Sequence, residues 1–335
     1  ASAGTSNFRA GVNAGNSITS GGNYNVVVGD EAGTALTTGD SNVAVGYAAL
    51  DLEDGGSNNT AIGNAALSTL NVDGAAYNTA VGSGAGQSVT TGLYNTLIGA
   101  LAGDALTVGG ENDVLGLGAL TSDTKGSHTV AIGRGALETQ NFTTATDVYN
   151  VAVGSFAGQS VTTGDENTLI GGLAGDALTT GADNVALGSS ALSGDTAGTD
   201  SVAIGRRALR VQNFSTTTSS FNTAVGASAG QSVTTGIENV LIGSLAGDAL
   251  SDADYNIAIG HNALTSDTLG SRAIAIGRHA LETQNFTTAT SNYNIGIGYN
   301  TGRLITTGTL NTLLGGQSGD AITTGAGNTA LGYAA

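Results

Sequence analysis

The chain has 335 residues with 55 Gly, nine Tyr and six Phe, and it contains no Pro, Cys, Met or Trp. Only 10% of the residues are charged, against about 25% in a typical globular protein, and the net charge at pH 7 is −17. The absence of Cys excludes disulfides and thiolate metal sites, and the acidic balance disfavours binding to nucleic acid or anionic lipid. No apolar run approaches the roughly 18 residues of a membrane span, so we expect no membrane insertion.

A short phrase of the form Asn-x-Ala-Val-Gly recurs along the whole chain. Its closing glycines are Gly11, Gly29, Gly46, Gly63, Gly82, Gly99, Gly116, Gly133, Gly154, Gly171, Gly188, Gly205, Gly226, Gly243, Gly260, Gly277, Gly298, Gly315 and Gly332. From Gly82 onward the sequence numbers of these glycines rise in steps of 17, 17, 17 and 21, which together make a period of 72. The chain is therefore a tandem repeat of nineteen small units grouped in fours, a pattern typical of solenoids.

Seventeen residues are too few for a helical hairpin repeat, which needs about 34. They fit one coil of two short strands and two turns, and the regular spacing of the apolar residues argues against disorder. We predict an all-β fold, a parallel β-solenoid or β-roll of about 19 turns with 17–21 residues each. We expect one domain over residues 1–335, with turn groups at roughly 1–77, 78–149, 150–221, 222–293 and 294–335.

Four residues before the Gly stands an Asn in sixteen of the nineteen units. The exceptions are Thr129, Ser201 and Ala273, which occupy the same slot of successive 72-residue blocks. Asn favours turns, and Asn side chains stacked in register can form an amide ladder. The predicted ladder consists of Asn25, Asn42, Asn59, Asn78, Asn95, Asn112, Asn150, Asn167, Asn184, Asn222, Asn239, Asn256, Asn294, Asn311 and Asn328.

Between Asn and Gly lie three strand residues, and both faces of this strand are apolar. The residue just before Gly is Val, Ile or Leu in eighteen units, as at Val81 and Ile98, and we expect it inside the coil. Its neighbour, mostly Ala, points to the opposite face, and a strand that is apolar on both faces is buried on both. We therefore predict a lateral interface with another copy through Ala80, Leu97, Ala152, Leu169, Ala224 and Leu241.

Two features distinguish the turns. The fourth residue after the Gly alternates in pairs, Gly86 and Gly103 and then Leu120 and Leu137, which predicts two turn shapes. An aromatic residue often precedes the ladder Asn, and we expect a corner where these rings cover the coil. These residues are Tyr24, Tyr77, Tyr94, Tyr149, Phe221, Tyr255 and Tyr293.

Each of the longer steps carries a Thr-rich insertion such as "TQNFTTATDVYN" at 139–150. The insertions contain the sequon Asn-Phe-Thr/Ser at Asn141, Asn213 and Asn285, and sequons on exposed loops are acceptors for N-glycosylation. The alternative is that Asn-Phe only packs the loop. We predict candidate glycosylation at these three residues.

Other polar residues give no catalytic, cofactor or metal site, and we expect no enzyme. Asp104, Asp176, Asp248 and Asp320 recur once in every four-turn block, or about 19 Å at roughly 4.8 Å per turn, which is too far to share a calcium ion. Arg134, Arg206 and Arg278 repeat near Glu138, Arg210 and Glu282, so the middle copy lacks the pair. A polysaccharide-cleaving site assembled across turns stays open as an alternative. Paired Thr residues, as at 90–91 and 162–163, raise ice binding as a third hypothesis.

The phrases "NTAVG…AG", "NVALGSSAL" and "SVAIGRRAL" resemble the head repeats of trimeric autotransporter adhesins, and they are similar to repeats in phage tail-fibre-like proteins. The resemblance covers nearly the whole chain. It implies a left-handed parallel β-roll in which three chains pack side by side, although the turns of this chain are longer than those of the adhesin pattern.

From the repeats and this resemblance we expect an extracellular structural subunit of a fibre or filament. Copies of the chain would associate by end-to-end stacking, as a side-by-side trimer, or both. The alternative is a receptor-binding adhesin or phage tail-fibre segment whose loops bind glycans or a cell surface, on a cell-surface appendage or a virion.

Overall fold

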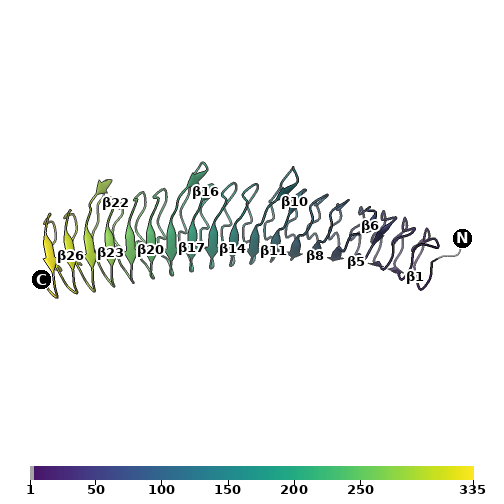
Figure 1. Ribbon diagram of the computed structural model, residues 1–335, viewed down its shortest axis with the longest axis horizontal. Coiled ribbons are helices and arrows are strands. Elements are labelled where there is room, and N and C mark those ends of the chain that lie inside the picture. Colours follow the sequence, from purple (N-terminus) through teal and green to yellow (C-terminus); the bar gives the residue numbers. More distant parts are fainter. Residues whose placement is uncertain (1–3) are drawn as a thin grey trace. The chain divides into compact units, whose positions relative to one another are not determined.

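The computed structural model describes residues 4–335. It confirms the predicted fold class, because these residues form strands and no helix, arranged as a parallel β-solenoid of about 19 turns. The solenoid divides into two compact units, Ala1–Glu166 and Asn167–Ala335. Within each unit the three-residue strands of successive turns lie side by side (Figure 1).

The first unit is built from nine three-residue strands and four two-residue strands. The longer strands are β1 (Phe8–Ala10), β2 (Val26–Val28), β3 (Val43–Val45), β5 (Thr60–Ile62), β7 (Thr79–Val81), β8 (Thr96–Ile98), β9 (Asp113–Leu115), β11 (Val130–Ile132) and β13 (Val151–Val153). The shorter strands are β4 (Gly56–Ser57), β6 (Gly74–Ala75), β10 (Gly126–Ser127) and β12 (Thr146–Asp147).

The second unit follows the same plan with ten three-residue strands. These are β14 (Thr168–Ile170), β15 (Val185–Leu187), β17 (Val202–Ile204), β19 (Thr223–Val225), β20 (Val240–Ile242), β21 (Ile257–Ile259), β23 (Ile274–Ile276), β25 (Ile295–Ile297), β26 (Thr312–Leu314) and β27 (Thr329–Leu331). The shorter strands are β16 (Gly198–Thr199), β18 (Thr218–Ser219), β22 (Gly270–Ser271) and β24 (Thr290–Ser291).

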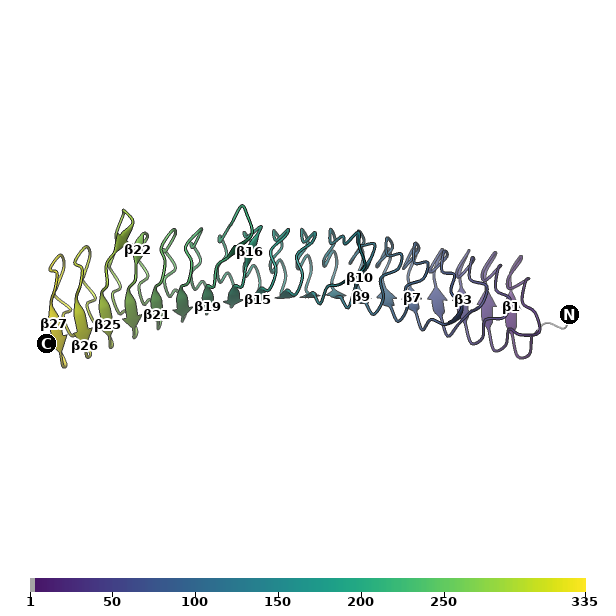
Figure 2. The same ribbon diagram turned by 45° about the horizontal axis from the view of Figure 1, so that its top comes forward.

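The long strands stay in register in spite of the unequal steps. Val130 lies opposite Val151 across a long step, and Val240 lies opposite Ile257 across a short one. The extra residues are taken up in long turns that carry the small parallel pairs β10–β12, β16–β18 and β22–β24. Figure 2 shows β16 and β22 on loops that project beyond the neighbouring turns of the second unit.

The middle residue of each long strand points into the coil, which reverses the predicted orientation. Ala80 is fully buried, whereas Thr79 and Val81 on either side are half-exposed. Asn78 is also buried, and since residues two apart share a face of a strand, Ala80 must follow Asn78 inward. The six residues predicted at a lateral interface, Ala80, Leu97, Ala152, Leu169, Ala224 and Leu241, all lie inside the coil with no exposed surface.

The Gly after each strand is required by backbone geometry and by close approach. At Gly99 φ is +135°, which L side chains rarely adopt, and a Cβ there would lie 2.6 Å from the carbonyl carbon of Gly116. Each such Gly therefore lets one turn settle directly on the next, because only Gly tolerates both conditions.

The alternation of Gly and Leu four residues later is explained by the space inside the coil. The position is left-handed in both kinds of turn, with φ of +58° at Gly86 and +51° at Leu120. A Cβ on Gly86 would lie 2.6 Å from Cδ1 of Leu97. Gly86 and Gly103 therefore stand on either side of Leu97, the large inward residue of β8. Leu120 is fully buried in the following turn, whose strand contributes the smaller Val114.

Candidate functional site

The predicted asparagine ladder is present in both units. The backbone N–H of Asn95 donates to Oδ1 of Asn78 at 2.9 Å, and its Nδ2 donates to the same oxygen at 3.2 Å and to the carbonyl of Gly109 at 3.0 Å. Asn239 makes the same contacts to Asn222 in the second unit. Except at Asn328, the ladder side chains are buried, and their amides satisfy backbone groups that water cannot reach.

Gln140 replaces the missing amide where the ladder has Thr129. This glutamine lies in the long turn that follows, and its side chain folds back into the coil, where it is fully buried. Its Oε1 accepts from Nδ2 of Asn150 at 2.9 Å, and its Nε2 donates to the Thr129 hydroxyl at 3.2 Å and to Asp123 at 2.6 Å. Gln212 and Gln284 repeat the arrangement beside Ser201 and Ala273, with Asn222 and Asn294 as donors.

The first turn group shows what happens when the ladder is unbroken. There the slot is occupied by Asn59, and Leu70 stands where Gln140 stands in the next group. The buried acid is Glu53, which accepts from the backbone N–H of Gly56 at 2.5 Å and of Val72 at 3.3 Å. Burial raises the pKa of Glu53 above its ordinary value of 4.5, because the charged form loses its hydration. The glutamine was missed by sequence reasoning, although its coincidence with Thr, Ser or Ala in the ladder slot was a usable signal.

The three predicted sequons lie at equivalent points of the long turns. Oδ1 of Asn141 accepts from the hydroxyl of Thr124 at 3.1 Å, and the following Phe142 is only 8% exposed. Asn213 and Asn285 bind the corresponding Thr hydroxyls at 2.9 and 3.1 Å. The phenylalanine anchors the turn while Thr143 is exposed to solvent. Loop packing and an accessible sequon therefore coexist in the same three residues.

The aromatic corner exists, but its rings project from the coil and do not cover it. Tyr77 and Tyr94 are 54% and 53% exposed, and their rings stack with centroids 5.8 Å apart. Their backbones are left-handed, with φ of +54° and +60°. The guanidinium of Arg272 lies 4.9 Å from the ring centroid of Tyr255 and 5.9 Å from that of Tyr293. Rings from neighbouring turns therefore stack on one another at the surface.

The outward face of the long strands is an apolar surface. In the second unit, two outward positions on each of ten strands give twenty residues, of which sixteen are Val, Ile or Leu and four are Thr. None of the twenty is buried and none is charged. Leu187, Ile242 and Leu314 are 42%, 38% and 45% exposed. In the first unit the corresponding face carries one charged residue, Asp113.

Of the remaining polar candidates, Thr121, Arg134 and Glu138 line one surface hollow together with Phe156. The hydroxyl of Thr121 donates to Asp104, and Thr265 donates to Asp248. Arg134 stacks over the ring of Phe156 at 5.1 Å, and Glu138 accepts from Gln159 at 2.7 Å. Over residues 4–335 no three His, Cys, Asp or Glu side chains are grouped so that they could hold a metal ion.

In the shorter turns, some of the Thr hydroxyls form hydrogen bonds within the solenoid. The hydroxyl of Thr90 donates to the carbonyl of Thr107 at 3.1 Å, and that of Thr107 to the carbonyl of Thr124 at 2.8 Å. These hydroxyls join one turn to the next. Ice binding by the exposed second Thr of each pair stays a prediction.

Comparison of the chain with protein families, with curated protein sequences and with solved structures finds no match. Within the described part of the chain, no helix has the length and apolar character needed to cross a membrane.

Proposed function

We propose that the chain is a structural subunit of an extracellular fibre, and that copies pack side by side through the outward face of their long strands. The observation that supports this most directly is the uncharged face of the second unit, in which Val, Ile and Leu occupy sixteen of twenty outward positions. Continuous exposed apolar surface of this kind marks an interaction site. The proposed lateral contact thus uses the outward Val, Ile and Leu residues. The sequence analysis predicted the contact through the neighbouring Ala column instead.

The periodic face favours a second copy of the same chain as the partner. Its apolar rows repeat with the spacing of adjacent strands, about 4.8 Å, so a partner with the same repeat stays in register over many turns. The whole chain carries 26 acidic residues against nine Lys and Arg, which keeps its other surfaces apart by repulsion. Three copies, as in the adhesin heads that the repeats resemble, would bury one such face from each chain.

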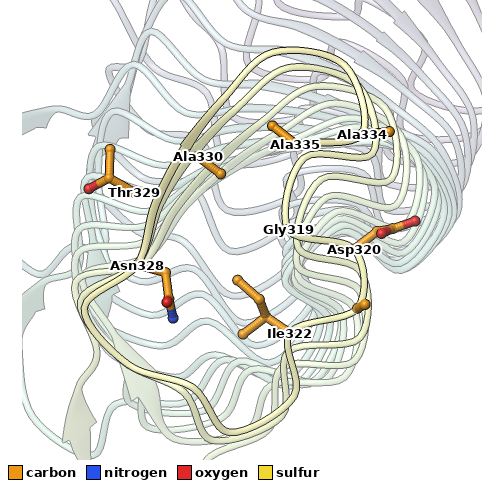
Figure 3. A pocket seen from close by; sticks show the side chains of 9 residues that line it. Gly319, Asp320, Ile322, Asn328, Thr329, Ala330, Ala334 and Ala335 are labelled. Atoms are coloured by element: carbon orange, nitrogen blue, oxygen red, sulfur yellow. The ribbon is translucent and has the colours of Figure 1, made fainter.

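End-to-end stacking is the second contact that we propose, because each turn offers the next one a fixed set of groups. In the turn formed by residues 319–335, for example, the side chains of Ile322, Asn328 and Ala330 point into the coil (Figure 3). Along the ladder, Oδ1 of one Asn accepts a backbone N–H from the following turn, as Asn311 accepts from Asn328 at 3.0 Å. The turn that begins at Asn7 of a second copy carries the matching sequence, and it would donate to Asn328 in the same way.

The lateral contact is tested by placing charge on the outward face. Ile259 and Ile276 are half-buried neighbours on β21 and β23, and their side chains face outward. We expect assemblies of the native chain at multiples of 32.5 kDa, and loss of lateral assembly in the double variant Ile259→Lys, Ile276→Lys. The matched control adds the same charges to the exposed long turn as Thr288→Lys, Ala289→Lys, which keeps the sequon at Asn285, and it should assemble normally.

Sedimentation velocity and electron microscopy of the three proteins decide the outcome. A native chain that remains monomeric at high concentration, or an Ile259→Lys, Ile276→Lys variant that still forms side-by-side assemblies, would overturn the lateral contact. Filaments lengthened by end-to-end contacts alone would separate the stacking proposal from the lateral one.

The second candidate function is a receptor-binding adhesin or tail-fibre segment, and the projecting long turns favour it. Thr143, Thr144 and Ala145 are exposed at the tip of the first such turn. Replacing all three long turns by the turn of a shorter unit should leave assembly intact. A fibre subunit would lose nothing else, whereas an adhesin would lose binding to its cell surface.

A further inference from the structure

A surface hollow of about 270 Å³ lies beside the aromatic corner of the first unit. One of its walls is the ring of Tyr94, and the next turn contributes Val108 and Glu111. Thr91 and Ser127 add hydroxyl groups to the lining. The hollow therefore combines an aromatic ring, an aliphatic side chain, a carboxylate and two hydroxyls in one open site.

The Tyr94 ring is held as a fixed platform. Tyr77 from the preceding turn stacks on it with centroids 5.8 Å apart and planes 10° apart. The backbone N–H of Tyr94 donates to the carbonyl of Ala76 at 2.9 Å, and the Tyr94 residue remains 53% exposed. Because the ring is already stacked, it loses less conformational freedom when a ligand binds, which lowers the entropic cost of binding.

The carboxylate of Glu111 is positioned by its neighbours in the following turns. Its Oε2 lies 3.4 Å from Nδ1 of His128, while Nε2 of His128 lies 3.5 Å from Oδ1 of Asp147. The imidazole ring also stacks on Tyr149 with centroids 5.2 Å apart. Glu111 is thus oriented by His128 through one oxygen, while its side chain stays 59% exposed.

We propose that this hollow binds a neutral hexose saccharide. The C–H-bearing face of a pyranose ring packs on an aromatic ring such as Tyr94, and its hydroxyls are donors for a carboxylate and partners for the two lining hydroxyls. No Lys, Arg or His lines the hollow, so nothing there would compensate the charge of an anionic ligand. This assignment is independent of the proposed assembly.

The equivalent residues of the next four-turn block provide an internal comparison. Tyr94 corresponds to Glu166, Val108 to Thr180 and Glu111 to Asp183. The preceding group keeps a ring in this slot, Tyr24, but it has Thr38 and Ser41 where Val108 and Glu111 stand. The combination of ring, aliphatic wall and carboxylate is thus specific to the turns around residue 94.

The test uses the full chain labelled with ¹³C at its nine tyrosines, titrated with cellohexaose, mannohexaose or maltohexaose while the tyrosine resonances are followed by NMR. We expect a saturable shift of the Tyr94 resonance with at least one of the three sugars. Tyr94→Asn should weaken binding by at least about tenfold, because Asn keeps the left-handed backbone and removes only the ring. The control Tyr255→Asn removes another exposed corner ring and should bind as the native chain does.

Three results would overturn the assignment. The first is no shift with any of the three sugars up to about 10 mM, beyond the range of a weak specific site. The second is equal binding by the native chain and Tyr94→Asn. The third is a saturable shift of the Tyr94 resonance with choline and none with the sugars, which would make the hollow a cation site. Thermal unfolding of each variant confirms that the comparison is made between folded proteins.

Discussion

Nε2 of Gln140 donates to Oδ2 of Asp123 at 2.6 Å, and neither residue has any exposed surface. The other oxygen of Asp123 accepts from the backbone N–H groups of Gly126 and Phe142, both at 3.1 Å. The carboxylate therefore joins the turn that contains it to the long turn that follows. The same contact recurs at 2.6 Å between Asp195 and Gln212 and between Asp267 and Gln284.

Gln140→Leu should destabilise the chain because it leaves buried polar groups without partners. The carboxylate of Asp123 loses its side-chain donor and Nδ2 of Asn150 loses an acceptor, and each such loss costs about 1–3 kcal/mol. Adding Thr129→Asn should recover part of this free energy, since Asn59 and Leu70 form that combination in the first group. Urea unfolding measures the difference. Equal stability of native chain and Gln140→Leu, or no recovery in the double variant, would contradict the role given to Gln140.

The repeat predicted the ladder and its gaps from the sequence, but it could not predict how the gaps are filled. The spacing identified Thr129, Ser201 and Ala273 as exceptions. Filling them depends on a glutamine from the following long turn folding back inside the coil, a contact made between two turns. Such contacts follow from the path of the long turn, which the local pattern does not contain.

The orientation of the strand was predicted wrongly for a different reason. Both columns, Ala80 and Val81, are apolar, so hydrophobicity alone does not say which of them faces inward. Inside the coil the space is limited, and the buried Asn78 two residues earlier sets the inward parity. A ladder of amides is thus a better guide to the inner face than side-chain size.

Gly99→Ala should be far more destabilising than Gly118→Ala in the same unit. A Cβ on Gly99 would lie 2.6 Å from the carbonyl carbon of Gly116 at φ +135°, so neighbouring turns must separate. Gly118 has φ +62° and no atom within 4 Å of its Cβ position, so Ala there costs only the left-handed backbone, about 1 kcal/mol. Thermal unfolding of both variants tests this. Similar melting temperatures would mean that contact between turns is not what selects the Gly.

Glu53 should make the chain less stable as the pH rises. Burial, the largest cause, raises its pKa in the folded state above 4.5. Between the unfolded and folded pKa values the folded chain therefore binds more protons, so the free energy of unfolding falls with rising pH and stays lower above that window. Glu53→Gln is uncharged at every pH, and its amide oxygen can still accept from Gly56. Its stability should decline less between pH 4.5 and the folded pKa than that of the native chain.

The control for this experiment is Asp73→Asn, which removes an exposed acid from the same turn group. Its unfolding free energy should follow the native pH profile. If Glu53→Gln and Asp73→Asn have the same profile as the native chain, the buried carboxyl does not contribute the pH dependence assigned to it.

Glycosylation of the long turns is the prediction that bears most directly on the proposed extracellular location of the chain. Hydrogen bonds hold Oδ1 of Asn141, Asn213 and Asn285 to Thr hydroxyls, which directs the acceptor Nδ2 of each side chain away from that contact. Peptide mass spectrometry of the native protein should therefore find added hexose mass at these three positions. Asn71 occupies the same place in the first group but is followed by Val72 and Asp73, so it lacks a sequon and should be unmodified.

The variant Thr143→Ala tests whether an added mass at Asn141 is an N-linked sugar or another modification of this turn. It removes the sequon while Phe142 still anchors the turn, so the mass at Asn141 should disappear and the masses at Asn213 and Asn285 should persist. Unmodified peptides at all three sites in protein from its natural source would leave Asn-Phe as a packing element alone. Modification at Asn71 would show that exposure of the turn, and not the three-residue sequon, selects the site.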